Sequence, residues 1–197
     1  YQTKFKKSLN FGIYSADLAN CVVHDQITDA QAYLKVIEDL ATDIGMNNVF
    51  EEDIIQRFKD NLHDRVAIAD ILTEVQIRTM EYIEMNGKDD LEAIYFAGAW
   101  MEGMYLGTIT AKQQDPRNIV QQLASQIELG NKIARGLENI EDQDPEIEEI
   151  RRSVLSIVNE YNTCESVLNA TEEDKDLGRS TLTAAEIDAI SGLVIEL

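Results

Sequence analysis

The chain of 197 residues has few of the residues that interrupt helices and few of those that build reactive sites. It contains 2 prolines, 10 glycines, 2 cysteines and 2 histidines. Because proline and glycine are the strongest helix breakers, their scarcity favours long uninterrupted helices. No segment alternates apolar and polar residues as a β-strand does. The sequence therefore predicts an all-α fold, a helical bundle of about seven helices.

Basic residues are also scarce, since 17 Lys and Arg face 37 Asp and Glu and the net charge is −20. Binding to nucleic acid or to an anionic membrane surface needs clustered Lys and Arg, so neither is expected. The one basic cluster lies at Lys4–Lys7, and we interpret residues 1–7 as an N-terminal tether. The chain opens without Met, which predicts that residue 1 is not the native start; a removed export leader and a trimmed chain would both explain this. Residues 8–197 are predicted to form a single helical-bundle domain.

Patterns typical of helix starts divide this domain. Four are cap residues followed three positions later by Glu or Gln, and two are Asp-Pro dipeptides. The pairs are Thr28 with Gln31, Asn48 with Glu51, Asp89 with Glu92 and Thr183 with Glu186, and the dipeptides are Asp115-Pro116 and Asp144-Pro145. They predict helices near residues 7–26, 29–44, 49–86, 90–112, 116–138, 145–172 and 184–196.

Apolar residues recur at alternating steps of three and four in several of these segments, as expected for helix faces that pack on a partner. The predicted helix 145–172 carries Ile147, Ile150, Val154, Ile157, Tyr161, Cys164 and Leu168 on one face. The predicted helix 49–86 carries Ile55, Phe58, Leu62, Val66 and Ala69, and then Ile71, Leu72, Val75, Met80 and Ile83.

A weak internal repeat relates residues 8–86 to residues 90–172. An offset of about 86 positions aligns Gly12 with Gly98, Tyr14 with Trp100, and Asp29 with Asp115. The sequence therefore predicts two related three-helix units followed by a C-terminal helix.

The segment Leu91–Ala111 is apolar or small almost throughout, yet it contains Glu102. A membrane span is disfavoured because a carboxylate at mid-depth costs a few kcal/mol and acidic residues flank the segment. We expect instead a helix enclosed by protein on all sides. Small residues at steps of four predict a groove that another helix approaches closely. These are Ala99, Gly103, Gly107 and Ala111, with Gly12 and Ala16 as the counterpart on the first helix.

A carboxylate in such a core must be hydrogen-bonded, ion-paired or protonated. Candidate partners for Glu102 are the hydroxyls of Tyr14, Tyr95 and Tyr105, the Trp100 indole, and Arg65 or Arg78. Three interpretations stay open: a polar contact that fixes helix register, a carboxylate-lined pocket for a ligand or cation, and partial exposure. The candidate ligand-binding residues are Tyr14, Asp17, His24, Trp100, Glu102 and Tyr105.

No pattern for catalysis or metal binding is found. Two histidines are too few for a carboxylate-bridged di-metal centre, and the acidic segments lack the EF-hand spacing of oxygen ligands. Cys21 and Cys164 form no CxxC motif, and the apolar and acidic surroundings of Cys21 disfavour a thiolate nucleophile. An interhelical disulfide between the two cysteines is left open. We predict no catalytic residue, metal ligand or cofactor, and hence no enzyme.

Two segments, "FGIYSADLANC" and "FAGAWMEGMYLGT", with "DAQAYLKVIEDLATDIG" between them, carry a resemblance to a known family. They resemble an uncharacterised family of all-helical exported lipoproteins from gut anaerobic bacteria. Matching positions are Gly12, Tyr14, Asp17 and Leu18 in the first segment and Gly98, Trp100, Glu102 and Gly103 in the second. The resemblance implies an exported, lipid-anchored helical domain, periplasmic or outer-membrane-anchored. It carries over no catalytic residue.

The function predicted from these features is a non-enzymatic, exported interaction or ligand-binding module, with an unknown protein or small molecule as partner. The alternative is a small-ligand or cation-binding protein with a carboxylate-lined pocket between the two central helices, around Asp17 and Glu102. A cytoplasmic location is left open.

Overall fold

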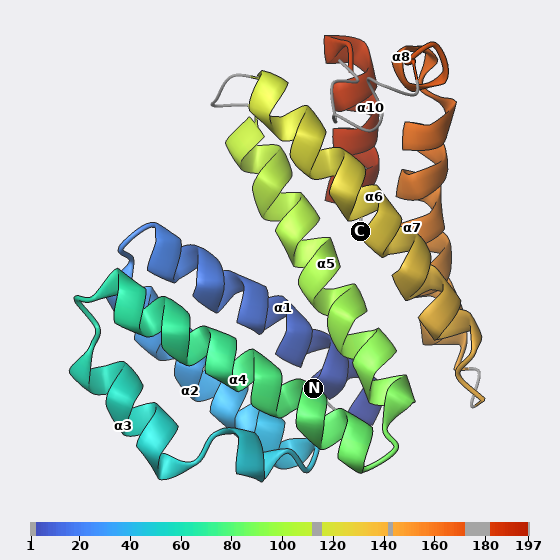
Figure 1. Ribbon diagram of the computed structural model, residues 1–197. Helices are drawn as coiled ribbons and strands as arrows, with labels where there is room; N and C mark the ends of the chain where they lie inside the picture. The colour runs from blue at the N-terminus through green and yellow to red at the C-terminus, as the bar shows by residue number, and fades with distance from the viewer. Residues whose placement is uncertain (1–2, 112–115, 142–143, 172–181, 197) are drawn as a thin grey trace. The chain divides into compact units, whose positions relative to one another are not determined.

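The computed structural model describes residues 3–111, 116–141, 144–171 and 182–196. Helices account for nearly all of this part of the chain and no strand occurs in it, so the predicted all-α class is confirmed (Figure 1). The chain divides into two compact units, Tyr1–Ala99 and Trp100–Leu197, which we call the N-terminal and C-terminal units. The division falls inside helix α5, Asp89–Ala111.

Helix α1 organises the N-terminal unit by packing against both α2 and α4, and α3 also packs against α4. Thr3 caps α1 by accepting a hydrogen bond from the Lys6 backbone N–H, so the helix takes in most of the predicted tether. The elements of this unit are α1 (Lys4–Val23), α2 (Ile27–Asp43), a 3₁₀ turn (Asn47–Val49), α3 (Glu52–Asp60), α4 (Arg65–Met85) and the start of α5.

The prediction of a single helix over residues 49–86 is wrong, because the helix is interrupted between α3 and α4. Asn61 ends α3, and Asp64 caps α4 by accepting hydrogen bonds from the Val66 and Ala67 backbone N–H groups, each at 3.0 Å. An N-cap Asp satisfies backbone donors that a continuous helix would bond internally, so it stabilises a new start. The first predicted apolar face, from Ile55 to Ala69, does not continue across this break, since Val66 is 72% exposed.

In the C-terminal unit, α7 packs against α6 and α10. Figure 1 shows these three helices in yellow, orange and red. The elements are the rest of α5, α6 (Pro116–Glu138), α7 (Pro145–Thr163), α8 (Glu165–Leu168) and α10 (Ala184–Ile195). The apolar face predicted for the α7 segment is largely confirmed, since Ile147, Val154, Ile157 and Tyr161 are buried. The predicted helix 145–172 is too long, however. Helix α7 ends at Thr163, because the backbone of its C-cap residue Cys164 leaves the helical conformation with ψ at 130°. Leu168, which lies beyond this end, is 66% exposed.

The predicted helix starts had mixed outcomes. Asp144 caps α7 ahead of Pro145, and Thr183 forms a complete capping box with Glu186, as predicted. Thr28 and Asn48 are not caps, because α2 already begins at Ile27 and Asn48 lies in the 3₁₀ turn. Helix α5 begins at Asp89 itself, and Asp115 lies outside the described residues.

Glu186 is held as a carboxylate by this capping box. It accepts hydrogen bonds from the Thr183 backbone N–H at 2.6 Å and from the Ser166 backbone N–H at 3.0 Å. The Thr183 contact is the main reason why the pKa of Glu186 falls to about 2. A backbone donor favours the charged form of the acid that it contacts.

We therefore expect Glu186→Gln to lower stability in a pH-dependent way. A depressed carboxyl pKa stabilises the fold above the unfolded-state pKa, about 4.5, and this contribution is lost as the pH falls through about 2. Urea unfolding of both proteins between pH 7 and pH 2 should show the difference in unfolding free energy shrinking across that range. A difference that does not change with pH would contradict a charge-assisted cap.

Helices α1 and α5 cross at a pair of glycines within the N-terminal unit. A Cβ atom on Gly12 would lie 2.1 Å from the Tyr95 carbonyl oxygen, and a Cβ atom on Gly98 would lie 2.1 Å from the Leu9 carbonyl oxygen. The predicted close crossing at Gly12 is thus correct. On α5 it is made at Gly98 and at the predicted Ala99, whose backbone nitrogen would lie 2.8 Å from a Cβ atom on Gly12. The predicted groove does not extend to Gly103 and Gly107, because no atom of the described residues lies within 4 Å of a Cβ atom at either position.

Candidate functional site

The Leu91–Ala111 helix is enclosed only in its first half. Leu91, Tyr95 and Trp100 are buried, whereas Tyr105 is 39% and Ile109 is 40% exposed. Glu102 is half-buried and has an interaction partner. The prediction of a helix walled by protein on all sides is therefore wrong for its second half, and partial exposure describes Glu102 best. In the part of the chain that the structure describes, no helix is long and apolar enough to cross a membrane.

The six candidate ligand-binding residues are distributed over both units. Tyr14 and Asp17 are half-buried on α1, where the Tyr14 ring lies 5.7 Å from that of Tyr33, and His24 is the exposed C-cap of the same helix. In the C-terminal unit, the buried Trp100 donates its indole N–H to the Gln126 carbonyl at 2.8 Å, and Tyr105 is exposed. The indole is thus used in holding α5 to α6.

Arg65 and Arg78, suggested as partners of Glu102, are bonded to other acids in the N-terminal unit. Arg65 forms an ion pair with Asp25. Arg78 contacts Glu74 on its own helix at 2.7 Å and also Glu51 and Asp53 near the start of α3. The Arg65 pair links the start of α4 to the turn between α1 and α2, and the Arg78 contacts link α4 to the start of α3. Both guanidinium groups are thus ion-paired.

The two cysteines are buried free thiols. Burial raises the pKa of Cys21, and the nearby Asp29 and Asp17 raise it further. Burial and the nearby Glu186 and Glu160 have the same effect on Cys164. The expectation that the Cys21 surroundings disfavour a thiolate is therefore confirmed.

The N-terminal unit contains a cavity of about 290 Å³, which we call the Phe11 cavity. It lies among α1, α2, α3, α4 and the start of α5, and none of the six candidate residues lines it. Its apolar wall is continuous with the core of the unit and is formed chiefly by Phe11, Leu18, Leu34, Phe50, Ile54 and Phe58. The Phe11 ring contacts Tyr95 at 5.3 Å and Phe50 at 6.2 Å between centroids, which fixes the aromatic part of the wall.

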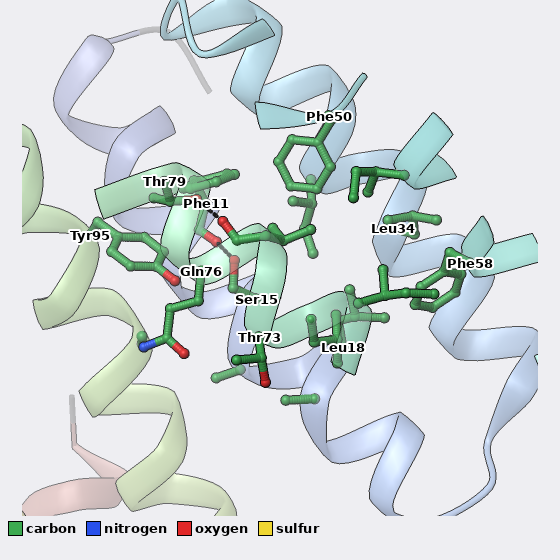
Figure 2. Close-up of a pocket in the computed structure, with 18 of the residues that line it drawn as sticks. Phe11, Ser15, Leu18, Leu34, Phe50, Phe58, Thr73, Gln76, Thr79 and Tyr95 are labelled. Atoms are coloured by element: carbon green, nitrogen blue, oxygen red, sulfur yellow. Dashed lines mark hydrogen bonds between the residues drawn. The ribbon is translucent and has the colours of Figure 1, made fainter. Parts of the chain in front are cut away.

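One part of the wall of the Phe11 cavity is polar and uncharged. Figure 2 shows Ser15, Thr73, Gln76 and Tyr95 on one side of the cavity, away from Leu34 and Phe58. Thr73 and Gln76 on α4 are exposed, as is Ala19 on α1, so the cavity opens between these two helices. No lining residue carries a charge.

The hydroxyl groups of this wall are oriented by their own helices. Ser15 donates to the Phe11 carbonyl at 2.6 Å, Thr73 to the Ala69 carbonyl at 2.9 Å, and Thr79 to the Val75 carbonyl at 2.8 Å. Burial raises the pKa of the Tyr95 hydroxyl, and the nearby Ser15 side chain opposes this with a smaller effect. The Ser15, Thr73 and Thr79 hydroxyls are therefore each held in one orientation, with their protons donated to backbone carbonyls.

Sequence reasoning did not find this cavity. Ile71, Leu72 and Val75, predicted as part of a packing face, line the cavity. The available signal was Thr79, a polar residue within that face, which is 1% exposed.

Comparison with protein-family models, with curated proteins and with solved structures found no match for this chain. Within the described residues there is also no group of three or more His, Cys, Asp or Glu side chains arranged to hold a metal ion. The site must therefore be interpreted from its own geometry.

Proposed function

We propose that this protein is a non-enzymatic ligand-binding module whose N-terminal unit binds one small, mainly apolar molecule in the Phe11 cavity. The observation that carries this proposal is a cavity that joins an aromatic and aliphatic wall to an open, polar, uncharged edge. Ligand sites in proteins combine the same two elements, a mostly apolar lining and a few placed polar groups.

The size of the cavity limits the ligand. A water molecule's share of liquid volume is about 30 Å³, so 290 Å³ corresponds to roughly ten non-hydrogen atoms. That volume lies at the small end of ligand pockets, which start near 300 Å³. An apolar cavity half as large, at about 150 Å³, stays dry and takes up benzene. The Phe11 cavity is thus suited to a substituted ring or a short chain.

The lining also separates this proposal from a cation-binding role. A buried cation needs paired charge or several oxygen ligands, and the lining of the Phe11 cavity provides no carboxylate. Asp17, one of the two acids of the predicted carboxylate-lined pocket, does not line the Phe11 cavity, and that pocket stays a prediction. An exported, lipid-anchored location and the duplicated unit both stay predictions.

A homologous series of alkylbenzenes tests the proposal by calorimetric titration. Each added CH₂ contributes about 0.8 kcal/mol when buried, so affinity should rise about fourfold per carbon from benzene up to butylbenzene. Hexylbenzene exceeds roughly ten non-hydrogen atoms and should bind more weakly than butylbenzene. Affinity that keeps rising with chain length would indicate nonspecific surface binding, and no binding at all would refute the proposal.

Blocking the cavity mouth provides a matched control. Ala19→Phe places a ring at the exposed edge of the cavity and should weaken butylbenzene binding at least tenfold. Ala32→Phe adds the same ring to an exposed position of α2 that does not line the cavity, and should leave binding unchanged. Equal affinities for the two variants would place the ligand somewhere else.

A further inference from the structure

We infer that the ligand of the Phe11 cavity carries an uncharged polar group at the cavity mouth, and that Gln76 selects this group over charged ones. This inference rests on the proposed function, because it assigns the ligand chemistry and a specificity-determining residue of the same cavity. It follows from three features of the lining: the two unlike ends of the cavity, the amide of Gln76, and the lack of charge.

The two ends of the cavity determine which part of a ligand faces solvent. Figure 2 shows Leu34 and Phe58 away from the side where Thr73 and Gln76 lie. Phe58 and Leu34 are buried, whereas Thr73 and Gln76 are exposed. Burying apolar surface is favourable and burying an unpaired polar group is costly, so an amphipathic ligand places its apolar body at the first end. Its polar group then lies at the mouth, beside α4.

Gln76 is the lining side chain best suited to contact a polar group at the mouth. The Ser15, Thr73 and Thr79 hydroxyls already donate their protons to backbone carbonyls of their own helices. Gln76 is the one lining residue with an amide side chain, which offers two N–H donors and a carbonyl acceptor. It can therefore pair with a neutral donor or with a neutral acceptor, but it has no charge to balance that of an ion.

The lack of charge in the lining disfavours ions of either sign. An ionic group that leaves water here meets no opposite charge, and this costs more free energy than the same transfer of a neutral group. Backbone N–H groups in the middle of α1 and α4 are used within those helices and cannot stabilise an anion. The net charge of −20 attracts cations at long range, but salt screens that field. A neutral polar group is thus matched better than an anion or a cation.

Four compounds of one carbon skeleton test this preference by calorimetric titration at pH 7 in about 0.15 M salt, which screens the long-range field. They are propylbenzene, phenylpropanol, phenylpropanoate and phenylpropylammonium. We expect both ions to bind about tenfold or more weakly than the alcohol, because each loses hydration without gaining a counter-charge. If either ion binds as tightly as phenylpropanol, or if propylbenzene binds and the alcohol does not, the inference fails while the proposed cavity stands. If none of the four binds, the proposed function fails.

A positive charge in place of the Gln76 amide should change which ligand is selected. Gln76→Lys should tighten phenylpropanoate binding about threefold to tenfold, the gain expected of a charged hydrogen bond that stays partly exposed, and leave propylbenzene binding unchanged. Gln31→Lys is the matched control, because it adds the same charge at an exposed position of α2 that does not line the cavity. It should leave both affinities unchanged. An equal effect of the two variants on phenylpropanoate, or no effect of either, would overturn the assignment of Gln76.

Discussion

Replacing Gly98 by alanine should lower the free energy of unfolding by about 3 kcal/mol, because the added methyl group has no room. The new Cβ atom would lie 2.1 Å from the Leu9 carbonyl oxygen and 3.2 Å from the Ile13 backbone nitrogen. Both contacts are to the backbone of a helix, so no side-chain rotation relieves them. Helices α1 and α5 would have to move apart and lose packing along their crossing. Urea unfolding followed by far-UV circular dichroism measures the change.

Gly103, on the same helix, is the matched control. It is exposed, and in the described part of the chain no atom lies within 4 Å of a Cβ atom at that position. Alanine is a better helix former than glycine, so Gly103→Ala should raise the free energy of unfolding by about 0.5–1 kcal/mol. Opposite signs for the two substitutions would establish that the crossing is made at Gly98. Similar small effects for both would mean that α1 and α5 are not in close contact there.

The fold class could be predicted because it depends on local properties that the sequence displays directly. Few helix breakers and a regular apolar spacing favour helices wherever those helices pack. Caps could be predicted where two signals coincide, as at Asp144 with Pro145 and Thr183 with Glu186. At Thr28 and Asn48 one pattern stood alone, and packing set the helix starts elsewhere.

The break between α3 and α4 was missed for a physical reason. Neither glycine nor proline marks it, and the apolar spacing from Phe58 to Leu62 is compatible with one continuous helix. What decides the break is the cap at Asp64, where one carboxylate serves two backbone donors. A lone Asp is frequent on exposed helix faces, so the residue by itself does not reveal that role.

The close crossing and the cavity depend on register and volume, which sequence patterns constrain only loosely. Small residues predicted that α5 approaches α1, but the position along α5 is fixed by how the ridges of two helices fit together. In this structure α1 approaches α5 most closely at Gly98, whereas no described atom lies within 4 Å of a Cβ atom on Gly107. A cavity is the difference between the space that several helices enclose and the side chains that fill it. Ser15 and Gln76 therefore gave no sign in the sequence that they border a cavity.

Replacing Trp100 by alanine should destabilise the C-terminal unit by about 3–5 kcal/mol, the cost typical of emptying a buried tryptophan site. The side chain is 3% exposed, and its indole N–H donates to the Gln126 carbonyl on α6 at 2.8 Å. Gly130, one turn further along α6, makes room for the ring: a Cβ atom there would lie 2.9 Å from the indole and 3.0 Å from the Val158 side chain of α7. The indole thus fills a space bounded by α6 and α7, and alanine would leave that space empty.

Two further variants separate the ring from its hydrogen bond. Trp100→Phe keeps most of the buried apolar area and loses the donor, so it should cost about 1–2 kcal/mol beyond the smaller ring volume. Tyr105→Ala is the control on the same helix, since its side chain is 39% exposed and should contribute less than about 1 kcal/mol. Urea unfolding by circular dichroism compares all three. If Trp100→Ala costs no more than Tyr105→Ala, the indole does not hold α5 to α6, and the core of the C-terminal unit must be centred on other residues.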